Sequence, residues 1–238
     1  MERVTNYLII GNGRVARHFR RYFTLLGLDF SSWARGEAID RLQVLAASAS
    51  HILLLISDNA IEPFIQANLP GSSALKIHFS GALNSPLAYG AHPLTTFNNG
   101  EYALEKYKAI PFVLDADAPD FARLLPNLPN THVRLDRELK AKYHALCVLS
   151  GNFSCILWQK FFTALEEELN FPAGIGQEYL KQQTENLLAD YKSALTGPLA
   201  RGDSVTLEKN LAALAGDPFQ EIYKSFVEVY SQIKKENR

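Results

Sequence analysis

The feature that most constrains the fold of this chain is a glycine turn between an apolar run and an amphipathic segment. The apolar run reads YLII at residues 7–10, and Gly11-Asn12-Gly13 follows it directly. From residue 14 to residue 26, apolar side chains recur at helical spacing. A buried strand that passes through glycines into a helix is typical of the first unit of a parallel α/β sheet.

The alternation of strand-like and helical segments continues to residue 136. Further strands are expected at residues 28–34, 51–57, 75–81, 109–115 and 132–136. Helices are expected at residues 14–26, 39–49, 60–67 and 119–125. This alternation predicts a mostly parallel sheet with helices on both faces.

The second half of the chain has a different pattern, because no strand-like run follows Asp136. Helical spacing instead occupies residues 139–169, 177–195, 204–214 and 217–235. The last helix is expected to have Asp217 as its N-cap and Pro218 at its first position. The sequence thus predicts an α/β fold in which a doubly wound Rossmann domain, residues 1–136, precedes an all-helical domain, residues 137–238.

Composition narrows the class of function. The 238 residues are 47% hydrophobic and 21% charged, with a formal charge of -1. A nearly neutral chain gives no electrostatic reason to expect nucleic acid or an anionic membrane surface as a partner. No apolar run reaches the roughly 20 residues that span a bilayer, and the N-terminus lacks the features of a secretory leader. We therefore expect a cytoplasmic protein.

The cysteines and histidines predict neither a disulfide nor a metal site. Cys147 and Cys155 lie in one expected helix, where eight residues correspond to about 12 Å, which is too far for a disulfide. No cluster of cysteine and histidine has the spacing of metal ligands. Both cysteines are therefore expected to be reduced, and no metal is expected.

The glycine turn matches a dinucleotide-binding loop. In such a loop the first glycine permits the tight turn, the second lets the backbone approach the pyrophosphate, and a small third residue lets the helix pack against the sheet. The alternative is a purely structural turn, but a position between a strand and a helix favours cofactor binding. The three positions are Gly11, Gly13 and Ala16, and the candidate phosphate-binding residues are Gly11, Asn12, Gly13, Arg14 and Val15.

The end of the second expected strand indicates which dinucleotide would bind. NAD sites usually place an Asp or Glu there, whereas this chain reads SSWAR at residues 31–35. Arg35, with Ser31 or Ser32, could hold a 2′-phosphate. We therefore predict NADPH as the cofactor, and the alternative is that Arg35 is simply an exposed loop residue.

Two later strand ends add candidate cofactor-binding residues. Ser57 and Asp58 follow the third strand, and Ser80 and Gly81 follow the fourth. In open α/β sheets, ligands bind at the carboxyl ends of the strands. Asp58 could equally cap the helix that follows it.

The segment KAKYHALCVLSGNF, residues 140–153, carries candidate catalytic groups. Lys140, His144 and Asn152 lie along one helical face because multiples of four residues separate them. A serine and a glycine in mid-helix cost about 1 kcal/mol in propensity, which indicates a close approach by another group. The alternative is that His144 is a partly buried histidine and Asn152 a packing amide.

His92, in AHPLTTF at residues 91–97, is the other acid–base candidate. Pro93 restricts the backbone of the preceding residue and so fixes the direction of the imidazole. Histidine suits proton transfer because its ordinary pKa lies near neutral pH. His144 is favoured over His92, because a helix places a side chain more rigidly.

Five segments together carry a family resemblance. They are GNGRVA (11–16), HFSGAL (78–83), AHPLTTF (91–97), KYHALCVLSGNF (142–153) and ALTGPLARGDSVT (194–206). In these segments the chain resembles the Rossmann-like proteins with a DUF2520 C-terminal domain, which are relatives of the ketopantoate reductase, pyrroline-5-carboxylate reductase and 6-phosphogluconate dehydrogenase group. It departs from the pattern at Asn210, where a histidine is expected.

The resemblance implies an NADPH-dependent reductase of a small keto or imino acid. The favoured reaction is reduction of 2-dehydropantoate (ketopantoate) to pantoate in pantothenate and coenzyme A biosynthesis. Two alternatives remain open: an imine reductase of the pyrroline-5-carboxylate type, and a non-catalytic NADP-binding regulatory protein.

The same resemblance implies site residues only in part. Ketopantoate reductases carry a lysine with asparagines four and eight residues later, and alignment on Asn152 places the lysine position at His144 and the first asparagine at Val148. His144 or Lys140 would therefore supply the proton, and Asn152 would orient the carbonyl.

The segment TGPLARGD gives the implied substrate-binding residues. Arg201 would bind a carboxylate, with Asp203 orienting it and also capping the next helix, and Thr196 would belong to the same site. The helical domain would also join two copies of the chain, so a homodimer is expected.

Overall fold

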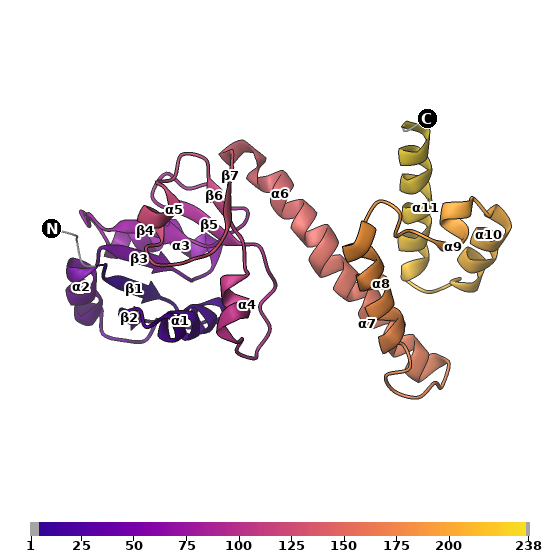
Figure 1. The fold of residues 1–238 in the computed structure, drawn as a ribbon, viewed down its shortest axis with the longest axis horizontal. Helices are drawn as coiled ribbons and strands as arrows, with labels where there is room; N and C mark the ends of the chain where they lie inside the picture. Colours follow the sequence, from indigo (N-terminus) through magenta and orange to yellow (C-terminus); the bar gives the residue numbers. More distant parts are fainter. Residues whose placement is uncertain (1–4, 237–238) are drawn as a thin grey trace. The chain divides into compact units, whose positions relative to one another are not determined.

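The computed structural model describes residues 5–236, and the first half of the chain is built around one sheet (Figure 1). Its strands are β1 (Tyr7–Ile10), β2 (Phe30–Trp33), β3 (His51–Leu54), β4 (Leu75–His78), β5 (Tyr89–Pro93), β6 (Phe112–Asp115) and β7 (His132–Leu135). Their order across the sheet is β2-β1-β3-β4-β5-β6-β7. Neighbouring strands are parallel except β5 and β6, which are antiparallel. The predicted mostly parallel sheet is confirmed.

Helices cover both faces of the sheet, as predicted. Tyr7 and Ile9 of β1 pack in one apolar cluster with α1, α4 and α5, and Leu8 and Ile10 pack in another with α2 and α3. Alternate residues of a strand point to opposite faces, so an unbroken apolar run suits a strand buried on both sides. The bounds of these helices are α1 (Arg14–Leu26), α2 (Ile39–Ser48), α3 (Asp58–Asn68), α4 (Leu104–Lys108) and α5 (Phe121–Leu124).

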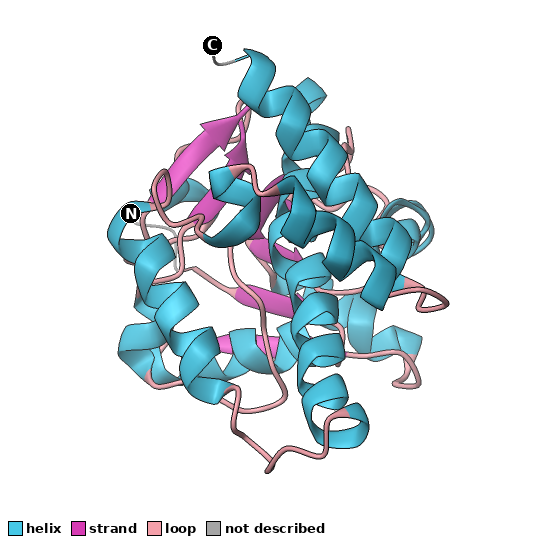
Figure 2. Ribbon diagram, turned by 90° about the vertical axis from the view of Figure 1, so that its right-hand side faces the viewer, coloured by secondary structure: helices cyan, strands magenta, loops and turns pink. Residues whose placement is uncertain are grey.

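From Lys140 onward the described chain is helical, and Figure 2 distinguishes these helices from the strands by colour. The α-helices are α6 (Lys140–Cys147), α7 (Ser154–Thr163), α8 (Gln177–Asp190), α9 (Gly197–Arg201), α10 (Ser204–Ala213) and α11 (Phe219–Glu236). Two π-helical stretches, Val148–Phe153 and Ala164–Glu168, continue the first two of them. The helix expected at residues 139–169 is therefore continuous.

Three short elements were not predicted: β5, α4 and α9. Strand β5 reads YGAHP, and its glycine and proline both weaken a strand pattern. Helices α4 and α9 have five residues each, too few to show a clear helical period.

The chain divides into two compact units, unit 1 from Met1 to Leu157 and unit 2 from Trp158 to Arg238. The predicted domain boundary after residue 136 follows the last strand of unit 1. Within unit 2, the rings of Trp158 and Tyr179 are in contact, and Lys160 forms an ion pair with Asp217 at 2.6 Å. The division into a cofactor domain and a substrate domain stays a prediction.

Two general features bear on function. Within residues 5–236, no helix is long and apolar enough to cross a membrane. Nor does this described part of the chain contain a group of three or more His, Cys, Asp or Glu side chains placed to hold a metal ion. Cys147 and Cys155 are free thiols in the structure.

Candidate functional site

A cavity of about 1500 Å³ lies in unit 1 at the carboxyl ends of β1, β3 and β4. In the order β2-β1-β3, the chain adds β2 on one side of β1 and then crosses over to add β3 on the other side. Ligands of open α/β sheets bind where the strand order reverses in this way. The glycine turn, the ends of β2 and β3, the segment after β5, and one side of α6 line the cavity. One cavity thus joins most of the segments singled out in the sequence.

Gly11 must be glycine because of the strands on either side of it. Its φ is +124°, and a Cβ atom here would lie 2.2 Å from the carbonyl oxygen of Leu55. The Gly11 amide donates to the Trp33 carbonyl at 2.9 Å, and the Leu55 amide donates to the Ile10 carbonyl at 2.8 Å. Gly11 therefore allows β1 to keep its backbone hydrogen bonds with β2 and β3 up to the carboxyl ends of these strands.

Gly13 has no such packing constraint. A Cβ atom here would meet no atom of the described chain within 4 Å. Gly13 is the N-cap of α1 and supplies no side-chain acceptor, so the first N–H groups of the helix are available to an anion. Ala16, in the first turn of the same helix, is fully buried. Open space at the second glycine and close packing at the third position both fit a pyrophosphate-binding loop.

Arg20 holds the glycine turn in place and was missed in the sequence. Its Nη1 donates to the Gly11 carbonyl at 3.0 Å, and its Nη2 donates to Asn12 Oδ1 at 2.8 Å. Long helical side chains point back toward the N-terminus, which lets Arg20 reach the turn. Arg14, which lines the cavity with Val15, instead donates to Asn99 Oδ1 at 3.2 Å.

The end of β2 presents a cation to the cavity. Arg35 lines the wall, and no ion pair within residues 5–236 involves its guanidinium. The nearby carboxylate of Glu37 accepts from the Ala34 amide at 2.8 Å and pairs with Arg41. Glu37 is therefore neutralised close to Arg35, which leaves a net positive charge at this end of the cavity.

The ends of β3 and β4 are joined by one side-chain hydrogen bond. Ser80 Oγ donates to Asp58 Oδ2 and accepts from the Leu83 amide at 2.9 Å. Asp58 is the first residue of α3, and the N-cap residue Ser57 makes no capping hydrogen bond with its own side chain. Asp58 thus fixes the loop after β4, while Ser57, Asp58 and Ser80 all line the cavity.

Two histidines meet beside Gly81 at the other end of the cavity. His92 on β5 and His144 on α6 have ring centroids 6.3 Å apart. A Cβ atom on Gly81 would lie 2.7 Å from His144 Cδ2 and 3.2 Å from His92 Nε2. Gly81 makes room for the two imidazoles, and its predicted approach to the cofactor stays a prediction.

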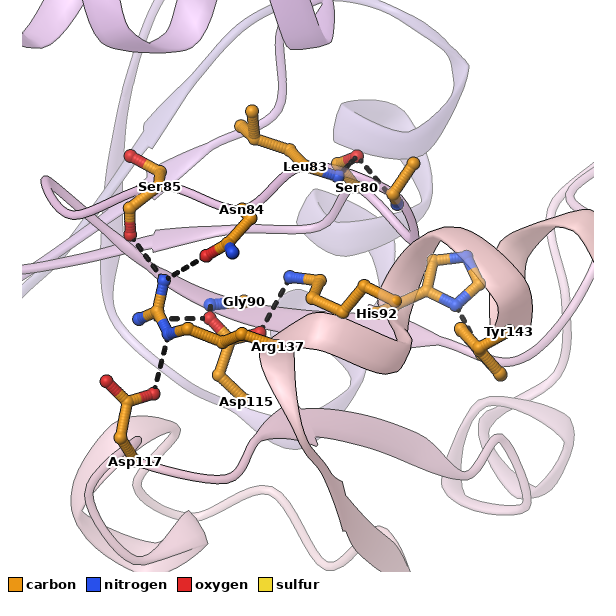
Figure 3. A network of polar contacts seen from close by, with 12 residues as sticks. Ser80, Leu83, Asn84, Ser85, Gly90, His92, Asp115, Asp117, Arg137 and Tyr143 are labelled. Atoms are coloured by element: carbon orange, nitrogen blue, oxygen red, sulfur yellow. Dashed lines mark hydrogen bonds and ion pairs between the residues drawn. The ribbon is translucent and has the colours of Figure 1, made fainter.

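Tyr143 is the partner of His92 and was missed in the sequence. Its hydroxyl lies 2.7 Å from His92 Nδ1 (Figure 3). Burial, together with the neighbouring His144 and Lys140, lowers the pKa of His92 to about 4 against an opposing effect of Asp58. Burial raises the pKa of Tyr143, and its contact with Cys147 adds to this effect. At neutral pH both groups are uncharged, so each can only donate or accept a hydrogen bond.

Lys140 does not line the cavity, although it shares a helical face with His144. Its side chain is 6% exposed, and Nζ lies 2.6 Å from Asp115 Oδ1. Asn152, by contrast, does line the cavity, in the π-helical stretch that contains Gly151. π-helical turns occur often at functional sites. His92, His144 and Asn152 therefore all line this cavity, whereas Lys140 does not.

The predicted substrate-binding residues lie in unit 2, which is described by itself. Thr196 is the N-cap residue of α9, and Arg201 is its last residue. Asp203 caps α10, since its Oδ1 accepts from the Thr206 amide at 3.0 Å and its Oδ2 from Thr206 Oγ1 at 2.7 Å. The expected capping role of Asp203 is confirmed, and the substrate-binding roles stay predictions.

The sheet, its helices and this cavity define a Rossmann-type α/β protein with a helical C-terminal part. Residues 110–229, half of the chain, match the family described as "Domain of unknown function (DUF2520)", and the chain belongs to that family. No curated protein matches the chain significantly.

Solved structures share the fold at low sequence identity. A proposed NADP oxidoreductase from Bacteroides fragilis is 22% identical with a TM-score of 0.77, covering 96% of this chain and 98% of that one. A reductive aminase from Aspergillus terreus, in complex with NADPH and ethyl levulinate, is 17% identical with a TM-score of 0.63, covering 99% and 95%. An imine reductase from Myxococcus stipitatus, in complex with NADP+, is 12% identical with a TM-score of 0.66, covering 97% and 94%.

Proposed function

We propose that this protein is an NADPH-dependent reductase of a small substrate with a C=O or C=N bond. The observation that carries the proposal is the single cavity, which joins the glycine turn and Arg35 at one end to His92 and His144 at the other. A dinucleotide with its phosphates on the turn would place its reactive ring toward the histidines. The named activities of the three similar structures support the same class of reaction.

The residues present fit the cofactor. Gly13 and the start of α1 would hold the pyrophosphate, since space and N–H groups are both available there. Arg35 would bind the 2′-phosphate, because its guanidinium is not committed to an acidic side chain of the described chain. When bound, NADPH supplies the hydride that such a reduction needs.

We assign proton donation to His144. It lines the cavity beside Gly81, and an imidazole can donate a proton near neutral pH. His92 is buried and uncharged, so its role would be to hold the substrate oxygen or nitrogen by a hydrogen bond. Asn152 would orient the same group from the π-helical stretch. Lys140 has no part in proton transfer, because its ammonium is committed to Asp115.

A keto acid, ketopantoate first, is the proposed substrate. Arg201 would bind its carboxylate, with Asp203 and Thr196 nearby in the sequence. A cyclic imine of the pyrroline-5-carboxylate type is the second candidate, and the similarity to a reductive aminase and an imine reductase favours it.

The test is NADPH oxidation with ketopantoate, run beside NADH and beside pyrroline-5-carboxylate. We expect turnover with NADPH, a weaker rate with NADH, and a loss of about a hundredfold or more in kcat for His144→Ala. Turnover with pyrroline-5-carboxylate alone would select the imine reaction. Tight NADPH binding without turnover of any substrate would instead indicate a regulatory NADP-binding protein, and no NADPH binding would overturn the proposal.

We also propose that two copies of the chain form a homodimer through unit 2. Its helices expose several large apolar side chains, which a second copy of the chain would cover. These include Leu188 on α8, Tyr191 just after it, Val205 on α10, and Phe226 and Val229 on α11. Light scattering coupled to gel filtration should give twice the chain mass of 26.6 kDa. A monomer at micromolar concentration would contradict the proposal.

A further inference from the structure

Strand β5 and helix α6 are connected in unit 1 by two neighbouring sets of side-chain contacts. Gly90 and His92 are two residues apart on β5, so they face the same side of the sheet. Lys140 and Tyr143 are three residues apart on α6, so they are neighbours on the helix surface. Gly90 meets Lys140 through Asp115, and His92 meets Tyr143 directly.

The first set of contacts is a buried ion pair between Asp115 and Lys140, in which both carboxylate oxygens and the ammonium have a polar partner. Asp115 is 1% exposed, and its carboxylate accepts from Lys140 Nζ at 2.6 Å and from the Gly90 amide at 2.7 Å. Arg137 adds a contact at 3.3 Å and also pairs with Asp117 (Figure 3). The pair therefore ties the end of β6 to the start of α6.

Gly90 leaves the space that the ion pair occupies. A Cβ atom here would lie 2.5 Å from Lys140 Nζ and 2.6 Å from Asp115 Oδ1. The backbone of β5 is thus in direct contact with both charges. Any displacement of the pair would move α6 relative to β5, and the His92–Tyr143 contact lies one helical turn along.

A buried ion pair is a poor device for stability alone, because the cost of desolvating two charges cancels much of their attraction. Such a pair instead fixes the positions of the elements that carry it, because a buried carboxylate and ammonium pair well only over a narrow range of distances and angles. We infer that the Asp115–Lys140 pair positions Tyr143 so that its hydroxyl holds the His92 imidazole at the cavity wall. The consequence for catalysis rests on the proposed function; the positioning itself does not.

Two variants of different chemistry test the inference. Lys140→Met combined with Asp115→Asn removes both charges together and leaves no lone buried charge. Gly90→Ala keeps both charges and displaces them, so it separates an effect of position from an effect of charge. Lys142→Met, an exposed lysine on the same helix, is the matched control.

The first readout needs no substrate. In protein with ¹⁵N-labelled histidine, the Nδ1 signal of His92 reports its hydrogen bond with Tyr143, and Tyr143→Phe gives the signal of the broken contact. We expect both test variants to move the His92 signal toward its position in Tyr143→Phe, while Lys142→Met leaves it unchanged. A folded Gly90→Ala or double variant with an unchanged His92 signal would overturn the inference.

The second readout is activity on the substrate that the wild type reduces. We expect kcat to fall on the order of tenfold in each test variant, with KM and NADPH affinity within about twofold of wild type. Adding Tyr143→Phe to the double variant should cause no further loss, because all changes act through one contact. Losses that multiply would contradict positioning through Tyr143. Absence of wild-type turnover would count against the proposed function only, since the nuclear magnetic resonance result would stand.

Discussion

The two glycines of the turn show how one residue type serves two physical purposes. Gly11 is fixed by a positive φ and by contact with the Leu55 carbonyl, whereas Gly13 has an ordinary extended backbone and open space around its Cα. The sequence pattern predicts both glycines but cannot distinguish them, because the contact with Leu55 depends on how β1 and β3 pair.

The two glycines therefore predict opposite effects of alanine. Gly11→Ala should lower the free energy of unfolding by about 3 kcal/mol or more, because the new Cβ meets backbone that cannot move freely. Gly13→Ala should leave the free energy of unfolding within about 0.5 kcal/mol of wild type and weaken NADPH binding at least tenfold. Urea denaturation and NADPH fluorescence titration of both variants check this. Equal NADPH affinity of Gly13→Ala and wild type would exclude phosphate binding at that turn.

Residues that act through distant partners were the ones that the sequence could not reveal. Lys140 shares a helical face with His144, which made it a catalytic candidate. Its partner Asp115 lies on β6, and only the tertiary structure shows that the ammonium is buried in that contact. Tyr143 was missed for the same reason, because its partner His92 lies on β5.

At the scale of elements, segments with a clear apolar pattern were predicted well, and β5, α4 and α9 were missed. The turn from β1 into α1 was predicted because its apolar run, glycines and helical period agree. Strand β5 was missed because its sequence contains a glycine and a proline, which are both unusual inside a strand. The missed strand carries His92, so the sequence identified this histidine as a candidate without placing it on the sheet.

The connection between β1 and α1 depends on Arg20. Arg20→Met should weaken NADPH binding about tenfold, because the Gly11 carbonyl and the Asn12 side chain lose the guanidinium that holds them. The melting temperature should fall by only a few degrees, since Arg20 is partly exposed. Calorimetric titration with NADPH measures the effect, and Arg17→Met, an exposed arginine on the same helix, is the control. Similar affinities for the two variants would remove Arg20 from the site.

At the scale of the whole molecule, buried histidines make the stability depend on pH. His78, at the end of β4, is fully buried, and within residues 5–236 neither of its ring nitrogens has a hydrogen-bond partner. Burial, together with the nearby Lys140, lowers its pKa to about 4. Burial also lowers the pKa values of His51 and of His92. The unfolded chain therefore binds protons that the folded chain excludes.

The direction of the pH effect follows from these shifts. Between about pH 6.5 and pH 4 the unfolded state holds more protons, so the free energy of unfolding falls as the pH is lowered. His78→Leu should reduce that loss by on the order of 3 kcal/mol, because a shift of this size corresponds to that free energy. Urea denaturation at pH 7 and pH 4.5 measures it, with His132→Gln, on exposed β7, as the control. An unchanged pH dependence in His78→Leu would show that folding does not lower the pKa of His78.

The stagger of β5 has a consequence for solvent exchange near the candidate site. Tyr89 and Gly90 pair with the last two residues of β4, so the rest of β5 continues beyond that end of the sheet. There it stays paired with β6 from Ala91 to Pro93, and the Leu94 amide donates to the Pro111 carbonyl at 2.8 Å. The part of the cavity wall that carries His92 is therefore part of a hydrogen-bonded sheet, not a free loop. Its amide hydrogens should be replaced by deuterium only when the sheet itself opens, so this wall persists on the timescale of global unfolding.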